Sequence, residues 1–332
     1  MSDTAQAPRR LPIAAILTAG LASGLLYASM LLAFAFLLPV QVVFGRYGRR
    51  EGLAAAGVAA VGVLAAQLWG FRPGAGGLGA LDIAVGALPA LVLLAALLII
   101  NAPFWGARVR PYKILAVAAA CALAALPLLL ALERDTSIAS FLEGRIGSIL
   151  APLSASVGDS YEASALAASL DPKEVVATSM TALRDSFAAI ILAVIGGSWR
   201  IGNRLSGPLG PGREETLPIE AFKLPFPLVW AFLGSWSLVL ATVLLHAAET
   251  PSAFAWNCAI AVSLLFAAQG WGIATHLFKS WNVPRSLRII TGVMAIIALV
   301  TPTAGYAVAA GLPLLGVTET WIPYRKPKGA GA

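Results

Sequence analysis

The chain is built from long apolar stretches separated by short charged segments. Most of these stretches are about 20 residues long or longer, enough for a helix to cross roughly 30 Å of hydrocarbon. A membrane β-barrel would instead show short segments in which apolar and polar residues strictly alternate. The pattern therefore predicts an all-α protein, a polytopic bundle of transmembrane helices. The runs without Asp, Glu, Lys or Arg lie at residues 11–44, 52–71, 83–107, 114–132, 186–199, 224–248, 250–278 and 289–318.

Two of these runs are longer than one membrane crossing requires. Residues 11–44 would extend about 51 Å as a single helix. The last run contains Pro302, and a proline removes a backbone donor and clashes with the preceding helical turn. Each long run is therefore either one tilted helix or a broken pair of short helices.

The distribution of basic residues favours the broken pairs. If both long runs double back, 18 of the 23 Lys and Arg residues fall on one side of the membrane, and if neither does, only 13. Because cytoplasmic loops are enriched in basic residues, this side is the cytoplasm. We therefore expect a bacterial cytoplasmic-membrane protein with both termini in the cytoplasm and eight to ten membrane segments.

One segment differs from the rest of the predicted membrane domain, which covers residues 1–332. Residues 133–185 hold eight of the sixteen acidic residues, and the topology places them outside as a helical extracytoplasmic insertion. Near its end, Asp171-Pro172-Lys173-Glu174 has the features of a helix start, with Asp as N-cap and Pro first in the helix. We expect that helix to continue through Trp199 into the bilayer. Residues 319–332 are expected to form a basic cytoplasmic tail.

Composition and charge agree with this topology. Hydrophobic residues make up 59% of the chain and charged residues 12%, which excludes an ordinary soluble domain. The net charge of +7 follows from the positive-inside rule and from attraction to anionic lipid headgroups, so the expected partner is the lipid bilayer. The basic clusters lack interleaved aromatic residues, which argues against nucleic-acid binding.

The sequence gives no reason to expect catalysis. It has no GxSxG or HExxH motif, and its GxGxxG match at residues 74–79 lies in a predicted loop with no strand before it. Its two cysteines lie in separate apolar runs and it has two histidines, too few for a disulfide framework or a metal site. We expect no enzymatic activity, no cofactor and no metal.

Three polar residues stand out in the apolar run 250–278. Gln269 and His276 are seven residues apart and share one helix face, whereas Asn257 lies about 120° away around the helix. A polar residue in a membrane helix usually faces the bundle interior or a cavity. It bonds either a neighbouring helix or a ligand. We take Gln269, Asn257 and His276 as candidate ligand-binding residues, with Gln269 the strongest of the three.

The C-terminal third resembles the YybS-like family of bacterial multipass membrane proteins, which has no assigned biochemical function. The resemblance covers residues 180–325 and is strongest in the closing Leu-Gly-Val-Thr-Glu-Thr-Trp-Ile-Pro-Tyr-Arg. This closing segment departs from the family pattern at Glu319, Pro323 and Tyr324, where the family has Asp, Asp and Phe. The positions that resemble family motifs, without a known role, are Asn203, Arg204, Gly270, Gly316, Glu319, Trp321 and Arg325.

The family is distantly similar to the substrate-binding subunits of energy-coupling-factor vitamin transporters. Those subunits recruit a partner membrane subunit through small residues on their first helix. The resemblance therefore implies a possible partner membrane subunit for this chain. The small residues spaced for such helix packing are Ala15, Ala19, Gly20 and Gly24.

Two functions remain open on the sequence. Broken apolar segments at both ends of a chain are typical of transporters with a central binding site. No Asp or Glu lies mid-span, as an ion-driven carrier would normally need. We therefore expect a small-solute-binding or transport-related module without energy-coupling residues of its own. The alternative is a membrane scaffold or assembly factor without a small-molecule substrate.

Overall fold

The computed structural model confirms an all-α helical bundle and contains no strand in the residues that it describes. It describes residues 12–29, 32–70, 80–103, 110–134, 171–207 and 218–325, with isolated residues between 136 and 148. Most of the predicted insertion 133–185 and residues 326–332 of the predicted tail lie outside this set. The helices are α1 (Ile13–Ala28), η1 (Ala33–Ala35), α2 (Leu37–Tyr47), α3 (Arg49–Gly70), α4 (Ala80–Ile100), α5 (Arg110–Arg134), α8 (Pro172–Leu205), η3 (Ile219–Ala221), α9 (Pro227–Leu244), α10 (Glu249–Ser280), α11 (Arg285–Val300) and α12 (Pro302–Thr318).

Several of these helices have the length and composition of membrane spans. Among the described residues, four qualify singly, within α3, α8, α9 and α10, and the bent pair α11–α12 makes a fifth if it is counted as one span. Helices α1 and α2 and the apolar parts of α4 and α5 are shorter. The chain therefore has the helices of a membrane protein, whereas the eight to ten segments and the cytoplasmic termini stay predictions.

Both overlong runs are broken, as the broken-pair interpretation requires. After α1, the Ser29 hydroxyl oxygen accepts the Leu32 N–H at 3.1 Å, and the chain passes through η1 into α2. Between α11 and α12, Thr301 is extended and Pro302 starts the next helix, because a proline disfavours the helical conformation in the residue before it. The chain bends by 116° at the break between these two helices.

The predicted helix start at residue 171 is confirmed. The Asp171 carboxylate accepts the Lys173 N–H at 3.0 Å, and Pro172 occupies the first helical position of α8. The helix is longer than expected, because it continues past Trp199 to Leu205.

The chain divides into two compact units, where the sequence predicted a single domain. Unit 1 comprises residues 1–121 and 190–217, and unit 2 comprises residues 122–189 and 218–332. Helices α5 and α8 each contribute residues to both units.

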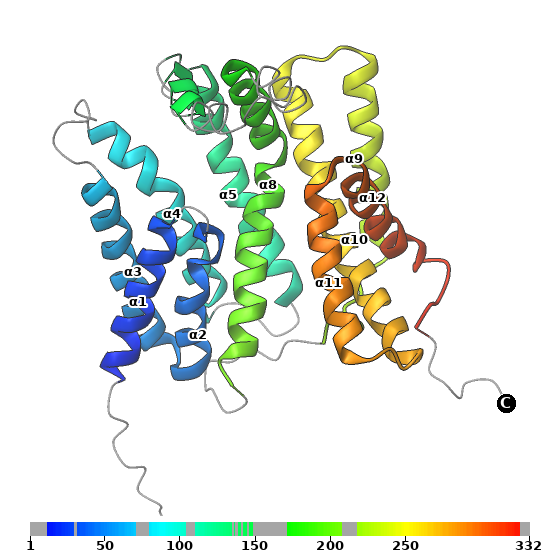
Figure 1. Cartoon of the computed structure of the whole chain (residues 1–332), viewed down its shortest axis with the longest axis horizontal. Helices are drawn as coiled ribbons and strands as arrows, with labels where there is room; N and C mark the ends of the chain where they lie inside the picture. Colours follow the sequence, from blue (N-terminus) through cyan, green and yellow to red (C-terminus); the bar gives the residue numbers. More distant parts are fainter. Residues whose placement is uncertain are drawn as a thin grey trace, which may run out of the picture. The chain divides into compact units, whose positions relative to one another are not determined.

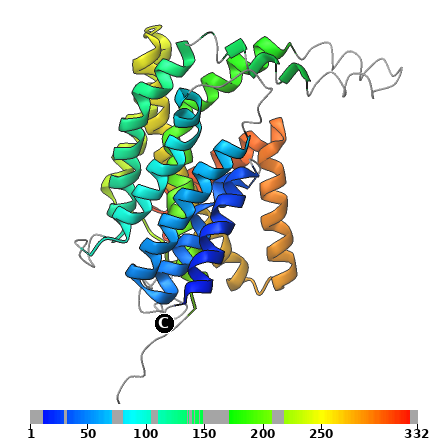
Figure 2. The ribbon, with the colours of Figure 1, turned by 90° about the vertical axis from the view of Figure 1, so that its left-hand side faces the viewer.

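In unit 1, α1 packs closely along α3, and the two blue helices run side by side in both ribbon views (Figures 1 and 2). A Cβ atom on Gly20 would lie 2.5 Å from the Val58 Cβ, and one on Gly24 would lie 3.0 Å from the Gly62 Cα. Ala19 packs on a small cluster formed by Ile16, Val43 and Ala55, and Ala15 is half-buried. Gly20 and Gly24 therefore pack α1 against α3 of the same chain, which leaves them buried rather than presented to a partner subunit.

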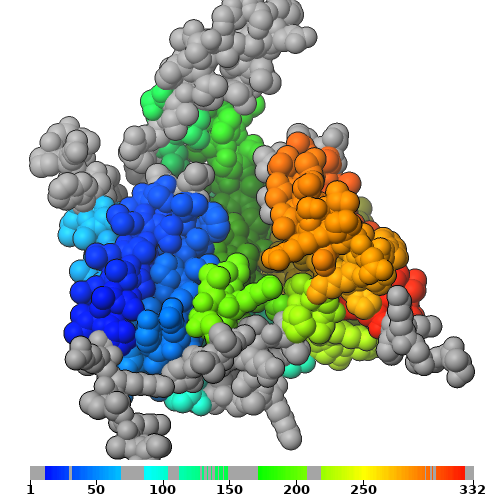
Figure 3. Space-filling model, turned by 60° about the horizontal axis from the view of Figure 1, so that its bottom comes forward, coloured from blue at the N-terminus to red at the C-terminus, as the bar shows by residue number. Residues whose placement is uncertain are grey.

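In unit 2, α10 packs against α9 and α12. A Cβ atom on Gly270 would lie 2.0 Å from the Leu312 carbonyl oxygen, and one on Gly316 would lie 2.0 Å from the Phe266 carbonyl oxygen. Only glycine permits α10 and α12 to approach so closely. The large apolar side chains that the structure describes on α11, orange in Figure 3, are exposed: Leu287, Ile289, Ile290, Val293, Met294, Ile297 and Leu299.

Candidate functional sites

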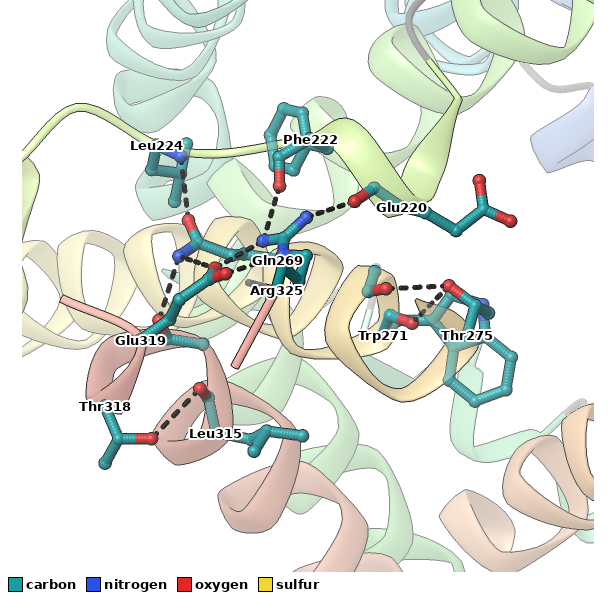
Figure 4. A network of polar contacts seen from close by, with 12 residues as sticks. Glu220, Phe222, Leu224, Gln269, Trp271, Thr275, Leu315, Thr318, Glu319 and Arg325 are labelled. Atoms are coloured by element: carbon teal, nitrogen blue, oxygen red, sulfur yellow. Dashed lines mark hydrogen bonds and ion pairs between the residues drawn. The ribbon is translucent and has the colours of Figure 1, made fainter. Parts of the chain in front are cut away.

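Gln269 lies at the centre of a hydrogen-bonded network in unit 2 (Figure 4). Its side chain is 2% exposed. Its oxygen accepts the Leu224 N–H at 2.8 Å, and its nitrogen donates to the Gly316 carbonyl at 3.0 Å and to the Glu319 carboxylate at 2.8 Å. Both amide protons are therefore used within the protein, and the oxygen has a protein donor.

Glu319 and Arg325 extend this network to the segment before α9. The Arg325 guanidinium forms a bidentate ion pair with the buried Glu319 carboxylate and donates to the carbonyls of Glu220 and Phe222, the latter at 3.0 Å. The Lys279 ammonium pairs with the Glu220 carboxylate at 2.6 Å. Residues 319–325, the first half of the predicted tail, thus fold back onto unit 2. We call Leu224, Gln269, Gly316, Glu319 and Arg325 the closed network.

The close glycine contacts explain why this network forms where it does. Because Gly270 and Gly316 bring α10 and α12 together, the last turn of α12 reaches the Gln269 amide. Four of the positions that resemble family motifs, Gly270, Gly316, Glu319 and Arg325, are therefore neighbours in space. Of the others, Trp321 and Arg204 are exposed.

The other two ligand candidates do not join Gln269. Asn257 is buried between α10 and α8, where its nitrogen donates to the Arg184 and Ala253 carbonyls and its oxygen accepts the Ala188 N–H. His276 is half-buried on α10, seven residues beyond Gln269. The structure therefore gives Asn257 and Gln269 two separate roles in joining helices, and it does not bring the three candidates into one site.

Arg184 on α8 is largely buried and ion-paired. Its side chain is 11% exposed and contacts the carboxylates of Glu133 at 2.9 Å and Asp185 at 3.1 Å. Because a buried charge requires compensation, these carboxylates and the Asn257 contacts fix this part of α8 to α5 and α10.

Unit 1 contains a second buried polar cluster, which sequence reasoning missed except for Asn203. Gln41 on α2 and Asn101 after α4 exchange two amide hydrogen bonds, of 2.7 Å and 3.3 Å. The Gln41 nitrogen also donates to the Asn203 oxygen on α8 at 3.3 Å. Gln41 and Asn203 are fully buried. Glycine at position 202 permits the close approach of Gln41 to α8. A Cβ atom on Gly202 would lie 2.5 Å from the Gln41 Cγ.

Lys113 and Trp199 continue this cluster. Trp199 is one helical turn before Asn203 on α8, so the two side chains share a face. The Lys113 ammonium lies 5.4 Å from the centroid of the Trp199 ring, and Lys113 is 1% exposed. We call Gln41, Asn101, Lys113, Trp199 and Asn203 the donor cluster.

Two hydrogen-bond donors of the donor cluster are unused. In the part of the chain that the structure describes, the Trp199 indole nitrogen and the Asn203 amide nitrogen are buried without a hydrogen-bond partner. Trp199 is 8% exposed. Such groups are rare in native proteins, because an unpaired buried donor costs about 1–3 kcal/mol, and each needs an explanation such as a bound water, ion or ligand.

A signal for the donor cluster was present in the sequence. Gln41 and Asn101 are uncharged polar residues within the apolar runs 11–44 and 83–107, as Gln269 is within its own run. Nothing in the spacing of residues 41, 101 and 203 shows that they meet. Only the packing of α2, α4 and α8 brings them together.

The comparisons with known proteins add no family. No protein-family model, no curated protein and no solved structure matches the chain. The likeness to the YybS-like family therefore rests on the quoted residues and stays a prediction. Among the described residues, no group of three or more His, Cys, Asp or Glu side chains is placed to hold a metal ion.

Proposed function

We propose that this chain is a membrane-embedded small-solute-binding or transport-related module, with its site at the donor cluster of unit 1. The observation that carries the proposal is the pair of unused buried donors on Trp199 and Asn203. A solute that accepts from both would remove the cost of burying them unpaired. The predicted topology supports the proposal, because it puts Gln41, Lys113 and Asn203 near the cytoplasmic ends of their helices.

The original ligand candidate, Gln269, is not the basis of this proposal. Its amide is engaged by Leu224, Gly316 and Glu319, which is what a helix-joining role requires. The proposed site therefore lies in unit 1, and the proposed class of function is the one that the sequence predicts. The proposal includes a partner membrane subunit that supplies the energy for transport.

Thermal unfolding of the full chain in detergent tests the proposal. A solute that binds only the folded protein raises its stability, by about 2.7 kcal/mol at a hundred times the dissociation constant. We expect at least one member of a panel of small cytoplasmic metabolites to raise the melting temperature of the wild type and of Gln269→Leu. The same solute should have no effect on Asn203→Leu. A wild-type melting temperature that ignores the whole panel would contradict the proposal.

A membrane scaffold or assembly factor is the second candidate, and the closed network favours it. Both protons and the oxygen of the Gln269 amide form hydrogen bonds that hold α10, α12 and the segment before α9 together. A scaffold requires such fixed geometry and no solute. Co-purification of a stoichiometric protein partner without any solute effect on stability would favour this function.

A further inference from the structure

Arg288, in the first turn of α11, carries a buried hydrogen-bond donor without a partner. Among the residues that the structure describes, nothing accepts from its Nε atom, which is buried, and no carboxylate forms an ion pair with its guanidinium. The side chain as a whole is half-buried. Unpaired buried donors are rare in native proteins, and a charge taken out of water normally has a counter-charge. Within the described chain, Arg288 has neither.

The position of Arg288 on α11 explains why its donor is buried. The half-buried residues among those described on this helix are Arg288, Gly292, Ala295 and Ala298. Residues 288, 292 and 295 are spaced four and three apart, so they share one helix face. A Cβ atom on Gly292 would lie 3.6 Å from the Trp271 ring of α10, which turns this face toward α10. Arg288 is therefore a charged residue on the packed face of α11.

The acidic side chains around the closed network are paired with other cations. The Glu319 carboxylate pairs with Arg325, and the Glu220 carboxylate pairs with Lys279. Residues 285–318, which form α11 and α12, contain no Asp or Glu. A guanidinium offers N–H donors and a permanent positive charge, and it has no acceptor atom. The unused group at Arg288 therefore matches a ligand that supplies an acceptor and a negative charge.

The surface next to Arg288 is apolar. Its neighbours Leu287, Ile289 and Ile290 are 51%, 58% and 55% exposed. A phospholipid combines acyl chains, which cover such side chains in a membrane, with a phosphate group. Guanidinium groups bind phosphate oxygens through charge-assisted hydrogen bonds. The predicted topology puts Arg288 near the cytoplasmic end of α11, at the level of the lipid headgroups.

We infer that Arg288 binds a phosphate group, with a phosphate oxygen accepting the Nε–H. The site lies in unit 2 and does not depend on the solute site proposed for unit 1. A phospholipid headgroup and a soluble phosphate compound offer the same acceptors and the same sign of charge. The exposed apolar side chains beside Arg288 favour the lipid, and the experiment below separates the two sources.

The Nε–H resonance of Arg288 reports on this site directly. The full chain is labelled with ¹⁵N-arginine in a maltoside detergent, which contains no phosphate, and the resonance is identified by its loss in Arg288→Lys. We expect phosphatidylglycerol added to the micelles to shift this resonance. A galactolipid with the same acyl chains carries no phosphate and should leave it unmoved. Equal shifts with both lipids would overturn the inference, because the acyl chains alone would then be responsible.

Titration with potassium phosphate separates the two sources. A shift with phosphatidylglycerol but not with potassium phosphate supports a lipid ligand. A shift with potassium phosphate but not with phosphatidylglycerol supports a soluble ligand, and a shift with both supports recognition of the phosphate group itself. Potassium chloride at the same ionic strength is the control. A shift of equal size with chloride, or no shift with either source of phosphate, would overturn the inference.

Two variants that remove the same charge test whether Arg288 acts specifically. Binding is measured as the rise in melting temperature on adding phosphatidylglycerol or potassium phosphate, whichever shifts the resonance. Arg288→Gln should raise the apparent dissociation constant by at least about tenfold, the equivalent of one lost hydrogen bond to a charged group. Arg49→Gln removes an exposed arginine at the predicted cytoplasmic end of unit 1 and should have a smaller effect, because salt screens an exposed charge.

The unliganded melting temperature of Arg288→Gln checks that this variant folds. We expect it to be close to that of the wild type, because among the described residues the guanidinium has no ion pair or hydrogen bond to lose. Equal weakening of binding in Arg288→Gln and Arg49→Gln would overturn the inference, since it would indicate general attraction of anions to a basic protein.

Discussion

The two units bury polar side chains in different ways. In unit 2, the closed network uses both protons of the Gln269 amide and balances the buried Glu319 charge with Arg325. In unit 1, the donor cluster joins three helices through amide pairs but leaves N–H groups on Trp199 and Asn203 without partners. Both clusters are buried among apolar side chains, so exposure to water does not explain the difference.

The difference indicates how each cluster contributes to the protein. A fully paired buried network stabilises one arrangement of helices, because separating any member leaves a charge or a donor without a partner. A cluster with unused donors is less favourable by itself and becomes complete only when something else accepts from it. The residue that looked most like a ligand contact in the sequence is therefore part of the closed network, and the proposed site lies where the hydrogen bonding is incomplete.

The largest effect is expected from removing the cation of the closed network. Arg325→Met leaves the Glu319 carboxylate, whose side chain is 4% exposed, without its counter-charge. We expect the free energy of unfolding in detergent, measured by titration with sodium dodecyl sulfate, to fall by about 3–5 kcal/mol. Lys279→Met is the control, because the Lys279 side chain that pairs with Glu220 is 56% exposed, and the change should cost less than about 1 kcal/mol. Similar losses in both variants would show that the buried pair has no special role.

The next effect tests the glycine contact that positions the closed network. Gly316→Ala places a Cβ atom 2.0 Å from the Phe266 carbonyl oxygen, so α10 and α12 must separate. We expect a loss of about 1–3 kcal/mol in the same unfolding assay. Gly311→Ala on the same helix meets nothing within 4 Å and should be neutral or stabilising by roughly 0.5–1 kcal/mol, since alanine favours helix. A neutral Gly316→Ala would refute the role of this contact.

A smaller loss is expected when the centre of the closed network is replaced. Gln269→Leu leaves the Leu224 N–H and the Gly316 carbonyl without partners. We expect a loss of about 1–2 kcal/mol, because hydrogen bonds between helices in a bilayer contribute modestly. The loss should be the same with or without added solute, and a solute-dependent loss would show that Gln269 contacts the ligand after all.

The smallest effect is expected at the equivalent position of unit 1. Asn203→Leu removes one long hydrogen bond from Gln41 and also removes the unused N–H groups, so gain and cost nearly cancel. Stability without added solute should change by less than about 0.5 kcal/mol. A loss as large as that of Gln269→Leu would mean that the donor cluster is itself a finished structural network, and the contrast between the two units would disappear.

The sequence by itself determined the class of the protein and several local features. Charge-free apolar runs require helices, because backbone groups in hydrocarbon must pair within the segment. Asp171 and Pro172 fixed the start of α8, and Pro302 fixed the break between α11 and α12, because capping and the missing proline N–H act within one turn. The excess length of residues 11–44 likewise indicated the break that separates α1 from α2.

Only the tertiary structure decided which polar residues are satisfied. Gln269 and Gln41 look alike in the sequence, since each is an amide within an apolar run. The Gln269 amide meets partners 45, 47 and 50 residues away, and Asn203 meets Gln41 across 162 residues. Likewise, the sequence alone allows Gly20 and Gly24 to pack against a partner subunit. In the structure they pack against α3 of the same chain. Spacing along one helix determines which face a side chain occupies, but the donors and acceptors opposite that face come from other helices, and helix packing alone determines which they are.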